Sequence, residues 1–329
     1  MKVDVDIIMR KLGDYLILNG YGLKDSGLYK GRAGISLSLF EAAKFLRDEK
    51  LEEAACLFLE QSLLTKVRDI SFENGLSGIA YVLHFLIRHK FVDANFNDLY
   101  GIQMAFIVEQ LNSACDDKIF INKNFNFVKI NHLFQYYKNV EAEQALTKIC
   151  HIVLSLYADK WEHIGNNPLG HHAIDLVMQE WKYILSAICK SSFYHPDISF
   201  FIPFVDLYKK GRIKYDNILF GYLHQIAIRE NFIVLSDFIA TYKQANDSFL
   251  IKGWDFVDII LENGYEIYSV LRTKLLQGNW DDIENTINRL IFNSDTRLGY
   301  QGGIAWLLLL MVYNHPSNEN FREIKELFF

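Results

Sequence analysis

A glycine pair that recurs at a fixed stride is the feature that most restricts the fold of this chain. Gly31 and Gly34 open an apolar segment, GLYKGRAGISLSLFEAAKFL (27–46), and Gly75 and Gly78 open a second, FENGLSGIAYVLHFLI (72–87). From Gly31 to Gly75 is 44 residues. Two helices and two connections fit that length, so we expect each repeat to be one helical hairpin.

A third opening of this kind lies far along the chain. The segment RLGYQGGIAWLLLLMVY (297–313) carries Gly299 and Gly302 just before an apolar run. Because glycine lets backbones approach closely where helix starts meet, we predict a structural role for all three pairs. Weaker versions of the opening begin at residues 166, 217 and 252.

The hydrophobic pattern predicts helices in two classes. Apolar spacing of three and four residues predicts helices at 5–18, 33–47 and 48–67. The glycine-opened helices are apolar almost all round, whereas the helix after each is amphipathic. This difference is typical of an inner ring of buried helices and an outer ring exposed on one side. Residues 119–130 alternate between apolar and polar, which predicts a short β-hairpin or an extended loop.

The composition limits the class of protein further. The chain has 329 residues, 50% of them hydrophobic, and no linker-like stretch, so we expect a single domain over residues 1–329. A net charge of −6 without a basic stripe argues against nucleic acid as a partner. The longest apolar run, 304–313, is too short to span a membrane. Four dispersed cysteines suit a reducing cytoplasm, where we expect the protein to be; they are Cys56, Cys115, Cys150 and Cys189.

The three glycine openings resemble the helix starts of the lanthionine synthetase C-like family. The resemblance covers residues 27–87 and 295–313 well and the middle of the chain weakly. Members of this family close thioether rings in ribosomally made peptides. The resemblance implies an all-α fold, an (α/α) toroid of about six or seven helical hairpins with the glycine starts at one mouth.

The resemblance also implies a zinc ion held by two cysteines and one histidine. In the family the first cysteine follows Gly-Trp, but here Asp255 follows Gly253 and Trp254. A Cys-His pair should precede a later glycine start. If the third opening belongs to the penultimate repeat, Arg297 and Leu298 occupy the positions of the cysteine and the histidine. If it belongs to the last repeat, the penultimate repeat contains no Cys-His pair before a glycine. We therefore predict no metal site of the family type.

Other site residues are expected from the resemblance alone. The family's acidic position, four residues before Gly75, is Ser71, with Asp69 two residues further off. Candidates for catalytic groups are His171, His224 and Asp255. Residues expected at the mouth, where they would bind a peptide, are Tyr29, Arg32, Glu73, Trp254, Arg297 and Tyr300.

Two further groups of cysteine and histidine residues could be taken for metal ligands. Cys150 and His151 are adjacent, but they lie within a helical pattern, where consecutive side chains diverge by about 100°, so we interpret Cys150 as a buried structural residue. His171 and His172 could form a different metal cluster with more distant residues, among them His195, His224, Cys189 and Asp255.

These considerations favour a protein of peptide maturation that has lost catalysis. Its partner would be a precursor peptide or a peptide-modifying enzyme, and it would need no cofactor. One alternative is an active cyclase or other peptide-modifying enzyme with an unusual zinc site. A second is a carbohydrate-active α/α toroid, with paired carboxylates drawn from Glu73, Asp175, Asp206, Asp255 and Asp258.

Overall fold

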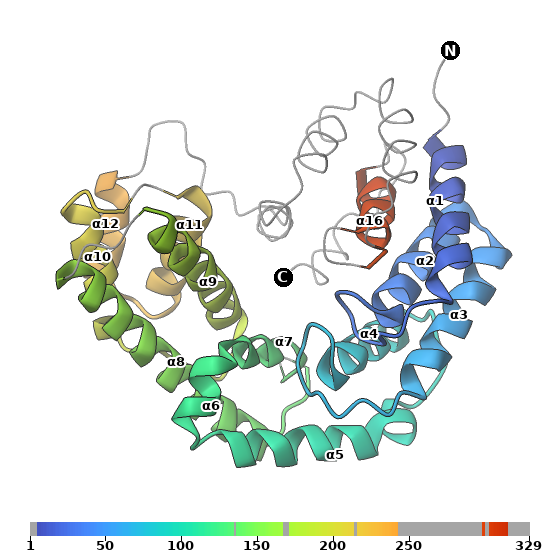
Figure 1. Ribbon diagram of the computed structural model, residues 1–329, viewed down its shortest axis with the longest axis horizontal. Coiled ribbons are helices and arrows are strands. Elements are labelled where there is room, and N and C mark those ends of the chain that lie inside the picture. Colours follow the sequence, from blue (N-terminus) through green and yellow to red (C-terminus); the bar gives the residue numbers. More distant parts are fainter. Residues whose placement is uncertain are drawn as a thin grey trace. The chain divides into compact units, whose positions relative to one another are not determined.

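Every regular element in the part of the chain that the structure describes is a helix (Figure 1). The computed structural model describes residues 5–134, 136–166, 171–213, 216–242, 298–299 and 303–314. The chain divides into two compact units, one of residues 1–105 and 256–329 and the other of residues 106–255. The all-α prediction is therefore confirmed for the described residues, and the single domain stays a prediction.

The first unit consists of helical hairpins and one helix from late in the chain. Helix α1 (Val5–Gly20) precedes the pair α2 (Arg32–Leu46) and α3 (Glu49–Leu63). Helix α4 (Leu76–Arg88) is followed by α5 (Phe96–Ala114), which runs on into the second unit. Helix α16 (Ile304–Asn314) completes the described part.

The two classes of helix predicted from the sequence are present. Helices α2 and α4 are buried along almost their whole length, including polar Ser36 and Ser77. Helix α3 instead buries one face, with Leu51, Ala55 and Leu59 inside, while its glutamates point outward. The predicted third helix, 48–67, is observed over Glu49–Leu63: Asp48 caps its first turn by accepting a bond from the Leu51 N–H, and Leu64 is its C-cap.

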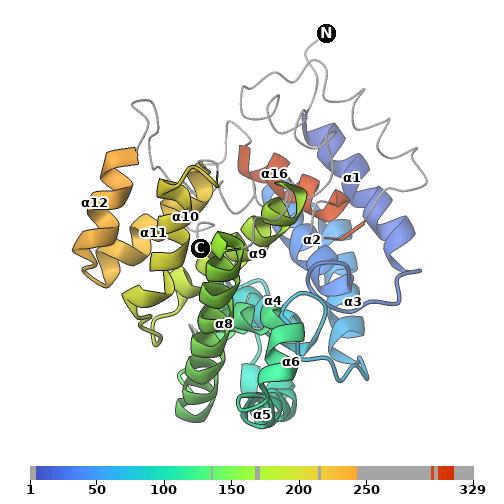
Figure 2. The same ribbon diagram turned by 60° about the vertical axis from the view of Figure 1, so that its left-hand side comes forward.

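Helix α16 packs against α1 and α2, although about 260 residues separate it from them (Figures 1 and 2). The red helix lies beside the two blue ones in both views. Its apolar side chains Trp306, Leu307 and Leu308 are fully buried. A helix from the third glycine opening beside the first hairpin is the neighbour expected in a toroid, which favours the register in which this opening is the last repeat.

The second unit is held by an aromatic core. Its helices are α6 (Lys118–Lys123), η1 (Phe125–Ile130), α7 (Asn131–Phe134), α8 (Val140–Asn166), α9 (His171–Lys190), η2 (Ile198–Phe200), α10 (Ile202–Lys209), α11 (Asn217–Arg229) and α12 (Ile233–Tyr242). Trp181 of α9 stacks on Tyr157 of α8, with 5.6 Å between the ring centroids. Trp161 meets Trp181 edge to face at 6.2 Å and Phe204 of α10 at 5.5 Å. Such pairs join three helices of the unit.

The prediction of a hairpin or extended loop at residues 119–130 is wrong. The segment forms the short helix α6 and the 3₁₀ helix η1. Asp117 caps α6 by accepting a bond from the Phe120 N–H, and Ile121, Phe127 and Ile130 are buried. The cap and the burial of these side chains outweigh the alternation, because a short apolar segment does not fix its own periodicity.

The first two glycine starts share one local structure. Residues 28–30 and 72–74 each form a turn, and Gly31 and Gly75 follow as N-caps in extended conformations, with φ of −117° and −107°. The Arg32 N–H donates to the Asp25 carbonyl at 3.1 Å, and the Leu76 N–H donates to the Asp69 carbonyl at 2.8 Å. The two hydrogen bonds are equivalent and lie 44 residues apart, so the repeat seen in the sequence is also a repeat of local backbone structure.

The third start repeats this structure in a register that the glycines alone did not reveal. The Ala305 N–H donates to the Leu298 carbonyl at 3.0 Å, as the Ala33 N–H donates to the Ser26 carbonyl at 3.2 Å. Helix α16 begins directly after Gly303, as α2 begins directly after Gly31, so this bond aligns Gly303 with Gly31 and Gly299 with Gly27. Gly302, predicted as structural, lies outside the described residues.

Three glycine starts stack directly on one another. The Tyr29 N–H donates to the Glu73 carbonyl at 2.6 Å, which joins the first start to the second. A Cβ atom at Gly27 would overlap the backbone of Asn74, and one at Gly299 would overlap the backbone of Tyr29 and Lys30. Gly31, Gly75 and Gly78 likewise face backbone atoms of their own starts. Gly34 is buried in α2. The glycines are thus required by close backbone approach.

We expect the substitution Gly27→Ala to lower the free energy of unfolding by about 1–3 kcal/mol, because the new methyl group displaces rigid backbone of the neighbouring start. Gly101→Ala is the matched control. Gly101 lies inside α5, and a methyl group added there would have open space for 4 Å around it, so alanine should raise stability by about 0.5–1 kcal/mol. Urea denaturation of both variants measures the two effects. Equal effects of the two substitutions would contradict the stacked arrangement.

Candidate functional site

The exposed edge of the stacked glycine starts is polar. Lys30 is exposed, and Arg32, Glu73 and Asn74 are partly exposed. Tyr29, expected to contact a peptide, is only 2% exposed and packs edge to face on Phe72, with 6.3 Å between ring centroids. Among the described mouth candidates, the charged ones therefore reach the surface and the aromatic one belongs to the core.

Two side chains at this edge stabilise the turns themselves. The Arg32 guanidinium donates to the carbonyls of Leu23 and Tyr21, which fixes the segment before the first start. The Asp69 carboxylate accepts bonds from the Ser71 N–H at 2.9 Å and the Ser71 hydroxyl at 2.8 Å. Ser71 thus occupies the family's acidic position as part of a turn, and Asp69 is the acid that holds it.

Several predicted site residues cannot be located. Asp255, Trp254, Arg297 and Tyr300 lie outside the described residues. His171 begins helix α9, and its side chain is not described. His224 lies in α11 and is partly exposed. The structure thus brings together Tyr29, Arg32 and Glu73 of the predicted mouth.

All four cysteines of the chain lie in described segments, and their surroundings keep the thiols protonated. Burial raises the pKa of Cys150 and of Cys189 to about 12. Burial, followed by nearby carboxylates, raises the pKa of Cys56 and of Cys115 from its ordinary value. Zinc binds the thiolate, so none of these positions favours the ligand form.

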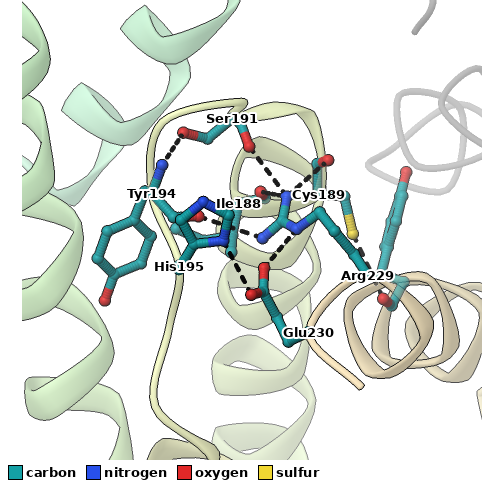
Figure 3. A network of polar contacts seen from close by, with 8 residues as sticks. Ile188, Cys189, Ser191, Tyr194, His195, Arg229 and Glu230 are labelled. Atoms are coloured by element: carbon teal, nitrogen blue, oxygen red, sulfur yellow. Dashed lines mark hydrogen bonds and ion pairs between the residues drawn. The ribbon is translucent and has the colours of Figure 1, made fainter. Parts of the chain in front are cut away.

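Figure 3 shows the polar partners of Cys189 and His195. The Cys189 thiol donates to the Tyr222 carbonyl of α11, with 3.3 Å between the heavy atoms. The His195 ring is 67% exposed, and its Nδ1 lies 2.9 Å from Glu230 Oε2. Both residues therefore belong to one network, but each has its own partner in it.

Arg229 is the centre of that network, and sequence reasoning missed it (Figure 3). Its guanidinium donates to four carbonyls in the last turn of α9 and just after it, those of Ile188, Cys189, Ser191 and Tyr194, at 2.9 to 3.3 Å. Its Nε also donates to Glu230. The last carbonyls of a helix have no hydrogen-bond donor within that helix, and here Arg229 of α11 donates to those of α9. The sequence carries no signal for it, because the partners are backbone atoms.

The described residues do not fit the zinc ion that the resemblance implies. They contain no group of three or more histidine, cysteine, aspartate or glutamate side chains placed to hold a metal ion. Cys150 is fully buried in α8 and accepts a bond from Asn131, whereas His151 is exposed, as predicted for adjacent residues of a helix. Leu298, at one possible ligand position, has an apolar side chain and uses its carbonyl to hold the third start.

Three of the carboxylates named for a sugar-cleaving site lie in the described residues, namely Glu73, Asp175 and Asp206. Asp175 and Asp206 are exposed on α9 and α10, and Glu73 belongs to the other unit. Asp258 lies outside the described residues. Asp175 and Asp206 have the solvated setting of ordinary surface carboxylates, whereas Glu73 is only partly exposed.

Comparisons with known proteins agree with the glycine starts. Residues 22–172 match the family model described as "Lanthionine synthetase C-like protein". The solved structure of a protein named "Nisin cyclase" matches 99% of this chain and 96% of its own, with a TM-score of 0.51 and 14% sequence identity. At that identity the likeness concerns the fold, and it supports the predicted α/α toroid. No curated protein matches the chain. None of the described helices combines the length and the apolar character that crossing a membrane requires.

We expect a thiol reagent such as Ellman's reagent to modify Cys56 first in the native protein at pH 8, because Cys56 is the exposed one of the four cysteines. Cys115 and Cys150, which are buried, should react only after unfolding, when four thiols are counted. The variant Cys56→Ser serves as the control and should lack the fast phase. Native Cys115 or Cys150 reacting as fast as Cys56 would contradict their burial.

We expect Arg229→Lys to lower the free energy of unfolding by about 2 kcal/mol or more, because a single ammonium cannot serve carbonyls arranged around a planar guanidinium. Arg68→Lys, at an exposed site, is the control and should change stability by less than about 0.5 kcal/mol. Denaturant unfolding followed by circular dichroism measures both. An equally small effect at Arg229 would mean that water satisfies these carbonyls.

Proposed function

We propose that the chain is a non-catalytic, zinc-free member of the lanthionine synthetase C-like family, whose model matches residues 22–172, and that it acts in lanthipeptide-type maturation. Its role in this proposal is to bind a precursor peptide or a peptide-modifying enzyme. The glycine starts supply the scaffold for binding. The chemistry of ring closure, which in the family depends on zinc, is left to another protein.

The state of the four cysteines is the observation that carries this proposal. A zinc site with two cysteine ligands needs two thiolates close together with a third donor. Here every cysteine has a raised pKa, and none belongs to a group of metal-ligating side chains among the described residues. The sequence supports the same conclusion, because Asp255 follows Gly253 and Trp254 where the family has its first cysteine.

The edge of the stacked starts is the surface that we propose for the peptide. Lys30 and Glu73 lie on neighbouring starts, whose backbones are joined by the bond from Tyr29 to Glu73. A cation and a carboxylate in fixed positions can select the charge pattern of a peptide. Because the starts are rigid, little conformational entropy is lost when a peptide binds.

We expect protein purified from zinc-supplemented cells to contain less than about 0.1 zinc per chain by elemental mass spectrometry. With a dehydrated precursor peptide from the same gene neighbourhood, the protein should bind the peptide but leave its free thiols unchanged. A zinc-containing family cyclase is the positive control for ring closure.

The binding surface is tested separately with Lys30→Glu, which should weaken peptide binding at least tenfold, whereas Lys123→Glu in the second unit should not. Stoichiometric zinc together with loss of peptide thiols would replace this proposal with an active cyclase of unusual ligands. If the protein contains no zinc and binds no peptide, its proposed role is to bind a peptide-modifying enzyme. Co-purification with the dehydrating enzyme of the same gene neighbourhood tests that role.

A further inference from the structure

A buried serine without a hydrogen-bond partner lies among basic side chains in the second unit. Ser186 of α9 is 3% exposed, and its hydroxyl has no partner among the described residues. Other buried helical serines are satisfied by carbonyls at 2.7 to 2.9 Å; they are Ser36, Ser38, Ser62 and Ser77. A buried hydroxyl without a hydrogen bond lowers the stability of the folded protein. We therefore expect Ser186 to bond to a group that is not part of the described chain.

Ser186 shares one face of α9 with Tyr183 and Lys190. Residues three, four and seven apart lie within about 60° of one another around a helix, so these three side chains leave the helix on the same side. Helices η1 and α7 pack against α9. Lys129 of η1 places its ammonium 4.2 Å from the centre of the Tyr183 ring. This contact identifies the face of α9 that is turned toward η1.

Three basic groups lie on this face of α9 or on the helices packed against it. Lys129 is 6% exposed and His132 of α7 is 8% exposed. Burial, followed by the charges of Lys190 and Lys129, lowers the pKa of His132 well below its ordinary value. Burial lowers the pKa of Lys190 to about 7, and the neighbouring Cys189 acts in the opposite sense. Asn131 of α7 also contacts Cys150 of α8, whose thiol is protonated.

We propose that Ser186, Lys190, His132 and Lys129 form a binding site for a small dianionic oxyanion of the phosphate or sulfate type. The Ser186 hydroxyl would donate one hydrogen bond to the anion. The two lysines and His132 would donate charge-assisted hydrogen bonds to it. A dianion would offset the mutual repulsion of the basic groups. Lys190, which keeps part of its surface exposed at the end of α9, gives the ion a route to solvent. The site is independent of the proposed peptide function.

The test uses sulfate, whose charge does not change between pH 6 and 8, with chloride at equal ionic strength as the control. Sulfate should raise the unfolding temperature of the full chain in a saturable manner. A bound dianion favours the protonated amine of Lys190, so affinity should rise as the pH falls through about 7. From pH 8 to pH 6 we expect roughly a tenfold gain, and calorimetry in two buffers should detect proton uptake on binding.

Variants separate the site from a general effect of charge. Ser186→Ala should weaken sulfate binding about three- to tenfold, and Ser62→Ala, at a buried helical serine that is already bonded, should not. Lys190→Met should weaken it at least tenfold and remove its pH dependence, whereas Lys210→Met at an exposed position should do neither. Protection by sulfate no greater than that by chloride, or unchanged binding in both Ser186→Ala and Lys190→Met, would overturn the proposal and leave water as the partner of the serine.

Discussion

Contact between backbones, with no side chain in between, is the constraint on which the first unit depends. The Tyr29 N–H reaches the Glu73 carbonyl, and Gly27 and Gly299 let adjoining starts come as close as their main chains allow. Helices α2, α4 and α16 begin at these starts, so the placement of the starts also fixes where three buried helices enter the core. The polar edge with Lys30 and Glu73 is a consequence, because those residues lie in the turns that the contact holds.

The fold was predictable wherever local pattern and tertiary environment agree. The helices near 5–18 and 33–47 and the contrast between buried α2 and half-buried α3 follow from apolar spacing. The segment 119–130 was not predictable in this way, because its alternation of residues conflicts with the Asp117 cap and with the burial of Ile121 and Phe127. The register of the third start needed the bond from Ala305 to Leu298, since several glycines in a row allow more than one alignment.

The candidate site was less predictable than the fold, for a physical reason. The sequence shows which side chains could bind a ligand or take part in a reaction. Whether they can do so depends on their exposure and on their hydrogen-bond partners, which the sequence does not show. Tyr29 was expected at a surface and lies in the core, whereas Arg32 reaches the surface and also holds a turn. Arg229 has no sequence signature because it binds carbonyls of another helix, and Ser186 is distinguished from other serines only by the bond that it does not make.

The position of α16 beside α1 and α2 affects how the protein can form in the cell. Residues 304–314 leave the ribosome long after the first hairpin, so the buried faces of α1 and α2 have to wait for them during translation. Contacts of such long sequence separation also slow folding, because a large loop must close before they form. The newly made amino-terminal helices therefore expose apolar surface until synthesis supplies the helix that covers them.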